Sequence, residues 1–173
     1  MNKRFSITAK DIVTLGAMVA IIEASKAALS FLPNIELTSF WLIVFTLVFG
    51  WKIALVVPAF ILVEGLIYGM GLWWIMYLYV WPLLVLVAWL LRKMESSVLW
   101  AAVSGFFGLL FGFLCSFVYL VTGNFETQIA WWIAGIPWDI VHCIGNFVLM
   151  LVLYKPVMAA MKKLCVGKYS IGS

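Results

Sequence analysis

The chain carries very little charge. Only 10% of its 173 residues are Asp, Glu, Lys or Arg, whereas 66% are hydrophobic, and the mean hydropathy is +1.16. A soluble domain averages about 25% charged residues, so this composition could not cover a water-exposed surface, and we expect lipid to be the solvent. The alternation of apolar and polar residues that is typical of a transmembrane β-barrel is also missing, which favours membrane-spanning helices.

Residues for covalent or metal chemistry are equally scarce. The chain has one His, and its three Cys residues lie far apart, without the spacing of a disulfide framework or a metal site. It has no Walker loop, no His–Glu metal motif and no Gly-x-Ser-x-Gly elbow. Ser104 and His142 have the residue types of a membrane-protease dyad, but nothing around Ser104 specifies one. We therefore expect no catalytic residue, no metal site and no cofactor bound by this chain.

The apolar residues gather into six segments, each of which is predicted to form a membrane helix. These segments cover residues 11–32, 37–50, 53–69, 72–91, 98–121 and 130–154. The second and third are shorter than the roughly 20 residues that usually cross a bilayer, which favours little tilt or a locally thinned membrane. No linker divides the chain, so we predict a single all-α integral membrane domain over residues 1–173.

The basic residues predict the orientation of these six helices. All Lys and Arg residues except Lys26 lie before the first helix, after the sixth, or in the two loops that six spans place on the same side. The opposite loops contain Glu36 and Glu126 but no Lys or Arg. Because cytoplasmic loops carry an excess of positive charge, we predict that both termini are cytoplasmic.

The first predicted helix carries small residues at a spacing of four. Gly16, Ala20 and Ala24 form this stripe, and they share one slowly drifting helix face. Small residues allow helix backbones to approach closely in lipid. The stripe is explained either by packing inside this chain's own bundle or by docking to another membrane subunit.

Several ionisable residues are predicted to lie at membrane depth, where they are costly and usually face protein or a cavity. Glu23 and Lys26 are three residues apart, and the favoured explanation for them is a structural ion pair on one helix face. Glu64 could be structural or could face a ligand. In the last helix, Asp139 and His142 share one face with Asn146, at spacings of three and four.

These three polar groups, together with outward aromatic residues and a short polar loop, predict a ligand cavity that opens to the outside. Tyr77 and Trp81 are four residues apart and could stack on a planar ring, although an interfacial aromatic belt explains other rings of this kind. The predicted substrate-binding residues are Asn34, Glu36, Glu64, Trp74, Tyr77, Trp81, Trp132, Asp139, His142 and Asn146.

Taken together, these features resemble the substrate-binding (S) components of energy-coupling factor (ECF) transporters, the vitamin importers of bacteria and archaea. The resemblance covers nearly the whole chain: six helices, cytoplasmic termini and a small-residue stripe on the first helix. Residues 34–37 and 48–52 are similar to the family's first outer loop and second helix, and residues 131–146 are similar to its ligand-contacting last helix.

The resemblance implies a multi-pass protein in the cell membrane of a prokaryote that binds a water-soluble vitamin or its precursor from outside. It implies two kinds of partner, a transmembrane coupling subunit and two ATPase subunits that would hold ATP and Mg²⁺. Gly16, Ala20 and Ala24 map to the stripe that docks to the coupling subunit.

The identity of the ligand is argued from the charge of the predicted site. Carboxylates outnumber cations there, which disfavours folates and phosphates and favours a small neutral or cationic ring such as hydroxymethylpyrimidine or pyridoxine. Cobalamin is the alternative ligand. Two other functional classes stay open: a stand-alone channel or secondary transporter, and a membrane enzyme or assembly factor.

Overall fold

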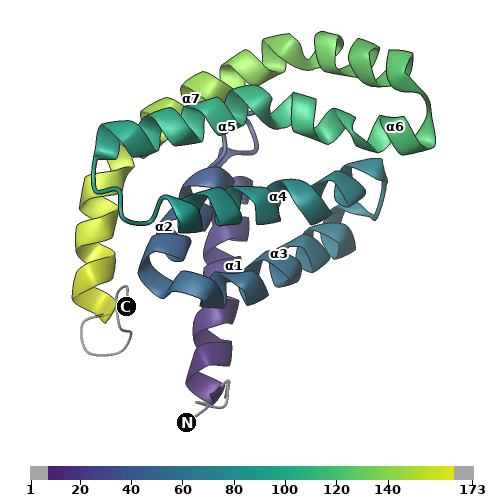
Figure 1. Ribbon diagram of the computed structural model, residues 1–173. Helices are drawn as coiled ribbons and strands as arrows, with labels where there is room; N and C mark the ends of the chain where they lie inside the picture. The colour runs from purple at the N-terminus through teal and green to yellow at the C-terminus, as the bar shows by residue number, and fades with distance from the viewer. Residues whose placement is uncertain (1–7, 166–173) are drawn as a thin grey trace.

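The structure is a computed structural model that describes residues 8–165, and within this range it contains helices and no strands (Figure 1). The elements are α1 (Ala9–Leu29), α2 (Thr38–Phe49), the 3-10 helix η1 (Gly50–Lys52), α3 (Ile53–Tyr68), α4 (Leu72–Leu90), α5 (Ser97–Ser116), α6 (Val118–Thr122) and α7 (Phe125–Cys165). The helical fold class predicted from the sequence is therefore confirmed for the described residues.

Several boundaries differ from the prediction, for local reasons. Helix α1 begins two residues early because Thr8 and Asp11 form a capping box, in which Thr8 Oγ1 accepts from the Asp11 N–H and Asp11 Oδ2 accepts from the Thr8 N–H. The predicted fifth helix is divided at Phe117 into α5 and α6. The predicted sixth helix is longer at both ends, and it becomes the 41-residue α7.

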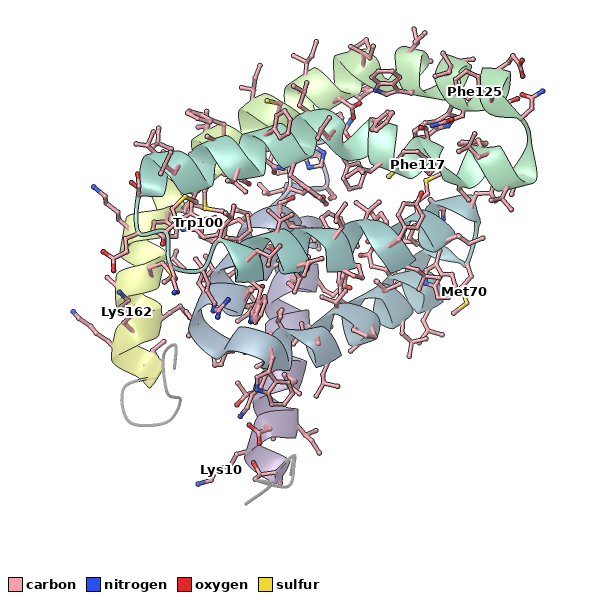
Figure 2. The ribbon with its side chains drawn as sticks, in the orientation of Figure 1. Lys10, Met70, Trp100, Phe117, Phe125 and Lys162 are labelled. Carbon is pink, nitrogen blue, oxygen red and sulfur yellow. The ribbon has the colours of Figure 1, made fainter. Side chains whose placement is uncertain are left out.

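Five helical segments within residues 8–165 are long and apolar enough to cross a membrane, as expected of a multi-pass membrane protein. One of them, Thr38–Tyr68, contains both the second and the third predicted helices. The number of six spans and the cytoplasmic side of the termini stay predictions. In Figure 2, Trp100 and Lys162 lie toward one end of the α4–α5 pair, and Met70 and Phe125 lie toward the other end.

Helix α2 is the short central element of the fold. Its 12 residues rise about 18 Å, less than the roughly 30 Å of a hydrocarbon core. Ten of the 12 are buried, and α2 contacts α1, α3, α4 and α7. A helix that is apolar on every side is stable only when it is covered on every side, and this explains why so short a segment is so hydrophobic.

Helix α7 packs along α5 and forms the most extensive helix pair of the fold. Glycines of α5 lie at this interface: a Cβ at Gly108 would lie 2.8 Å from the His142 carbonyl oxygen, and one at Gly105 would lie 3.2 Å from that of Cys143. The backbones therefore approach as closely as small residues allow. Beyond this interface α7 bends (Figure 1), and it contains Pro137 and Pro156, each of which removes a backbone hydrogen bond.

Candidate functional site

A small polar cavity of about 200 Å³ lies where α1, α3, α4, α5 and α7 meet the loop between α1 and α2. Its lining residues are Lys26, Leu29, Ser30, Leu32, Asn34, Ile35, Glu36, Tyr68, Tyr77, Phe111 and His142. Five of these residues come from the loop between α1 and α2, which closes one wall of the cavity. Asn34 adopts a positive φ of 55° at the tip of this loop, a conformation that Asn tolerates better than most residues.

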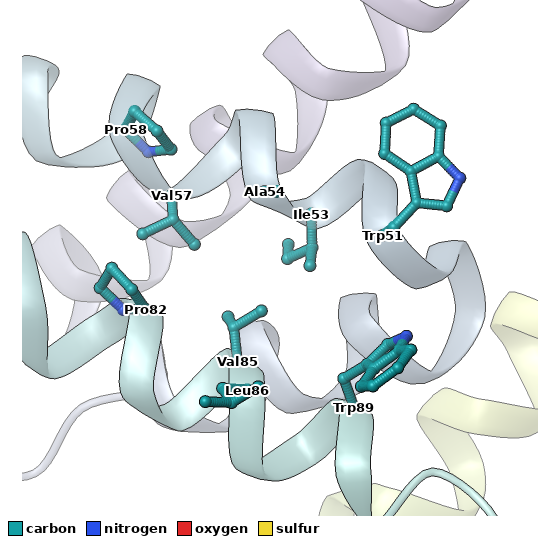
Figure 3. Close-up of a pocket in the computed structure, with 9 residues that line it drawn as sticks. All are labelled: Trp51, Ile53, Ala54, Val57, Pro58, Pro82, Val85, Leu86 and Trp89. Atoms are coloured by element: carbon teal, nitrogen blue, oxygen red, sulfur yellow. The ribbon is translucent and has the colours of Figure 1, made fainter. Parts of the chain in front are cut away.

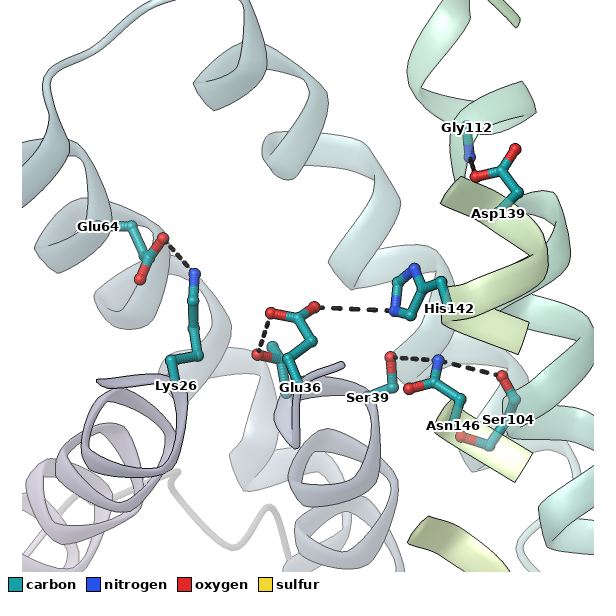
Figure 4. Close-up of polar contacts among 10 residues, drawn as sticks. Lys26, Glu36, Ser39, Glu64, Ser104, Gly112, Asp139, His142 and Asn146 are labelled. Atoms are coloured by element: carbon teal, nitrogen blue, oxygen red, sulfur yellow. Dashed lines mark hydrogen bonds and ion pairs between the residues drawn. The ribbon is translucent and has the colours of Figure 1, made fainter. Parts of the chain in front are cut away.

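One wall of the cavity carries a carboxylate opposite an imidazole. Glu36 Oε1 lies 3.8 Å from His142 Nε2, and Glu36 Oε2 accepts a 3.2 Å hydrogen bond from Thr38 Oγ1 (Figure 4). His142 is only 4% exposed, and its Nε2 has no hydrogen-bond partner among the described residues. A separation of 3.8 Å is too long for a hydrogen bond, so these two atoms do not satisfy each other.

Lys26, which lines another side of the cavity, forms a partly buried ion pair. Lys26 Nζ lies 2.6 Å from Glu64 Oε2 (Figure 4), and the Glu64 side chain is 2% exposed. The same ammonium lies 5.6 Å from the ring centroids of Phe60 and Tyr77 and 5.9 Å from that of Tyr68. The carboxylate balances the charge of Lys26, and the three aromatic rings attract it further. Together they stabilise a cation that would otherwise be costly at membrane depth.

This geometry changes the predicted pairing of Lys26. The sequence favoured an ion pair with Glu23, three residues earlier on the same helix, whereas the structure pairs Lys26 with Glu64 of α3. The Glu23 carboxylate lies close enough to Glu64 to interact with it, and Lys26 contributes to the electrostatics of both. The cation therefore joins α1 to α3.

Four of the ten predicted substrate-binding residues line the cavity: Asn34, Glu36, Tyr77 and His142. Glu64 is adjacent to it through its ion pair with Lys26.

Two of the other predicted polar residues connect helices away from the cavity. Asp139 is 5% exposed, and its Oδ1 accepts a 2.9 Å hydrogen bond from the Gly112 N–H of α5. Asn146 is 3% exposed, and its Nδ2 donates to Ser39 Oγ and to the Ser104 carbonyl oxygen (Figure 4). Both residues hold α7 against its neighbours, and neither belongs to the cavity lining.

The three predicted Trp residues also lie outside the lining. Trp74 Nε1 donates a 2.8 Å hydrogen bond to the Ile61 carbonyl oxygen and so fixes α4 to α3. Trp81 is fully buried, and it packs behind the two cavity rings of Tyr77 and Phe111, each at 5.3 Å. Trp132 packs on Phe113 at 5.0 Å.

Three prominent lining residues were not predicted as site residues. Lys26 is the one cation within a predicted membrane segment, but the predicted pairing with Glu23 gave no indication of its place at the cavity. Tyr68 lies one turn after Glu64 on the same helix, and this spacing is the signal in the sequence that could have identified Tyr68 as a site residue. Phe111 stands in a run of apolar residues, and nothing in the sequence distinguishes it from its neighbours.

The small-residue stripe of α1 faces outward. Gly16, Ala20 and Ala24 are all exposed, and a Cβ placed on Gly16 would meet no atom within 4 Å. Packing of the stripe inside this chain's own bundle is therefore excluded for residues 8–165. The stripe is a narrow, smooth face that lipid or another helix can cover.

Among residues 8–165, no group of three His, Cys, Asp or Glu side chains could hold a metal ion. Comparison of the chain with models of known protein families, with curated proteins and with solved structures finds no match.

Proposed function

We propose that this chain captures a small ring-containing solute in the cavity beside Glu36 and His142 and serves as the substrate-specificity subunit of an ECF-type importer. In this proposal the chain binds hydroxymethylpyrimidine, pyridoxine or a ring of similar size from outside a prokaryotic cell membrane. Delivery then requires a transmembrane coupling subunit and two ATPases, and the chain itself catalyses no reaction.

The observation that carries the proposal is the spacing of Glu36 and His142. A single amino or hydroxyl group placed about 2.8 Å from both Glu36 Oε1 and His142 Nε2 would form a hydrogen bond with each, because the two atoms are 3.8 Å apart. Buried polar atoms are costly unless they are bonded. A solute that carries such a group therefore gains binding free energy from these two hydrogen bonds as well as from the contacts of its ring.

The size and shape of the cavity favour a small ring. A volume of about 200 Å³ is below the usual range of roughly 300–1,000 Å³ for drug-sized ligands. It suits a single substituted pyrimidine or pyridine, and it disfavours cobalamin, whose macrocycle is far larger. The rings of Tyr77 and Phe111 provide flat apolar walls for stacking, and the Glu36 carboxylate disfavours an anionic solute.

The first test is a binding titration of the detergent-purified protein with hydroxymethylpyrimidine, pyridoxine, thiamin, riboflavin, biotin, folate and cobalamin. We expect saturable binding of a small amino- or hydroxyl-bearing ring, reported by tryptophan fluorescence, since Trp81 contacts both Tyr77 and Phe111. Glu36→Gln should weaken binding at least about tenfold, because a hydrogen bond to a charged group contributes about 1.5–3 kcal/mol.

Glu126→Gln is the matched control, since it makes the same change at an exposed residue near the start of α7, outside the cavity lining. Equal affinities of the two variants would move the site away from Glu36. If none of the seven compounds binds, the solute-binding role itself fails. Flux of the solute through liposomes that contain this chain alone would instead favour a channel or secondary transporter.

The exposed stripe of α1 supports the second part of the proposal, association with a coupling subunit. We expect Ala20→Trp and Ala24→Trp each to abolish co-purification with that subunit while solute affinity is retained, because an indole would separate the two helix backbones. Ala102→Trp is the control, since Ala102 is an exposed alanine on α5. If both α1 variants still co-purify as Ala102→Trp does, the docking face lies elsewhere.

A further inference from the structure

A groove on the surface of α3 and α4 is lined almost entirely by apolar side chains. It lies between the first half of α3 and the second half of α4 and has a volume of about 310 Å³. Figure 3 shows Pro58 and Pro82 at one end of the groove and Trp51 and Trp89 at the other. No residue of the solute cavity takes part in it.

The dimensions and position of the groove fit a lipid chain. Trp89 follows Pro82 by seven residues, so the groove runs for about 10 Å along α4, roughly a third of the hydrocarbon core. Ala54 provides a low floor on α3, since its methyl group is small and exposed. The two indoles mark the end that lies nearest the headgroups, because Trp rings gather at membrane interfaces.

A cation stands at this tryptophan end. The Arg92 guanidinium carbon lies 4.2 Å from the centroid of the Trp89 ring, and Arg92 Nη1 donates a 2.9 Å hydrogen bond to the Trp89 carbonyl oxygen. Arg92 is exposed and forms no ion pair within residues 8–165. Because a guanidinium has five N–H donors in a planar fork, this stacked arrangement leaves donors directed away from the ring.

Further positive charge lies on the other side of Arg92. Arg92 also lines a second hollow of about 450 Å³ with Lys155 and Lys162 of α7, where Glu95 is the one carboxylate among the lining residues. Arg92, which stacks on Trp89 at the end of the groove, thus also belongs to a hollow lined by three cations and one carboxylate. An apolar slot that leads to an excess of positive charge is complementary to a lipid with an anionic headgroup.

We infer that the α3–α4 groove is a binding site for an anionic glycerophospholipid, with an acyl chain between the prolines and the tryptophans and the headgroup phosphate on Arg92. This site is separate from the solute cavity and does not depend on the solute or on a coupling subunit. Its selectivity comes from Arg92, whereas the groove itself would accept the acyl chain of any phospholipid.

Native mass spectrometry of the full chain, with phosphatidylglycerol and phosphatidylcholine of identical acyl chains supplied in equal amounts, tests this site. We expect phosphatidylglycerol adducts to exceed phosphatidylcholine adducts about fivefold, the factor expected from one basic residue near an anionic lipid. Arg92→Gln should remove most of this preference. Lys93→Gln, which removes the neighbouring exposed cation, should leave it nearly unchanged.

A second pair of variants tests the groove. Ala54→Phe fills its floor and should lower phosphatidylglycerol adducts more than twofold, whereas Ala59→Phe, at an exposed alanine of the same helix outside the groove, should not. Equal binding of the two lipids by the unmodified chain would overturn the inference. So would equal effects of Arg92→Gln and Lys93→Gln, which would mean that positive charge in general attracts the lipid.

Discussion

Gly108→Ala is expected to lower the free energy of unfolding by about 2 kcal/mol, although it adds only one methyl group. The new Cβ would lie 2.8 Å from the His142 carbonyl oxygen and 2.9 Å from its carbonyl carbon. Both atoms belong to the backbone of α7, so relief of the clash requires the helix itself to move. Overpacking of a well-filled interior typically costs about 1–3 kcal/mol, and this contact lies in the most extensive helix pair of the fold.

The same substitution should weaken solute binding, because movement of α7 at residue 142 changes the distance from His142 Nε2 to Glu36. Gly16→Ala is the matched control: it makes the identical change in a membrane helix, where the new Cβ would meet nothing within 4 Å. Thermal unfolding of the two variants in one detergent gives the comparison. If Gly108→Ala unfolds at the same temperature as Gly16→Ala, the close approach of α5 and α7 is wrong.

The contrast between these two glycines also shows what a small-residue stripe can predict. The stripe on α1 was visible in the sequence, and the structure places it on an exposed face of the helix. A stripe of the same kind runs along α5 through Ser104, Gly108 and Gly112, all of which are buried. Spacing alone does not say which stripe is covered by the chain itself, because that depends on how the helices are arranged.

The individual helices could be predicted because each is a continuous apolar run that ends at polar or turn residues. The bend and extension of α7 could not, since apolar and basic residues continue the helix beyond the expected end with only Pro156 to mark a change. The central place of α2 was also beyond prediction. A short apolar segment has the same composition whether lipid or protein surrounds it.

The candidate site was predicted in part for a similar reason. Glu36 and His142 stand out because polar groups are rare in this chain, and both line the cavity. Tyr77 and Trp81 share a helix face at a spacing of four, yet Tyr77 lines the cavity and Trp81 lies behind it in the core. Periodicity gives the direction in which a side chain points, whereas depth along that direction is set by tertiary packing.

The pairing of Lys26 was missed because its partner is distant in sequence. Glu64 lies 38 residues away, and only the packing of α1 against α3 brings the two side chains together. Of the two carboxylates, only Glu23 satisfies the helix spacing rule. A rule based on sequence neighbours therefore selects Glu23 and cannot find Glu64.

Lys26→Met is expected to lower the free energy of unfolding by about 3–5 kcal/mol, although it leaves the backbone unstrained. Methionine fills most of the space of the lysine stem but leaves Glu64, which is 2% exposed, as a buried carboxylate without its cation. Glu23 lies close enough to the same carboxylate to interact with it. The expected loss of stability is larger than the net contribution of the ion pair, because it includes the free energy of leaving a buried charge uncompensated.

A double-mutant cycle distinguishes this cause from simple loss of packing. Glu64→Gln in the Lys26→Met background should restore a large part of the lost stability, because it removes the stranded charge and keeps the shape of the side chain. Lys52→Met is the matched control. It breaks the ion pair between Lys52 and Asp11, whose side chains are 28% and 12% exposed. Both are more accessible than their counterparts in the Lys26–Glu64 pair. We therefore expect Lys52→Met to lower the free energy of unfolding by about 1 kcal/mol or less.

Unfolding by denaturant in detergent of the unmodified chain, Lys26→Met, Glu64→Gln, the double variant and Lys52→Met measures these differences. Equal losses for Lys26→Met and Lys52→Met, or no recovery on adding Glu64→Gln, would mean that the Lys26–Glu64 pair does not hold α1 against α3. Recovery of stability without recovery of solute binding would have a different meaning. It would show that the ammonium among the rings of Phe60, Tyr68 and Tyr77 is needed to shape the cavity as well as to neutralise a carboxylate.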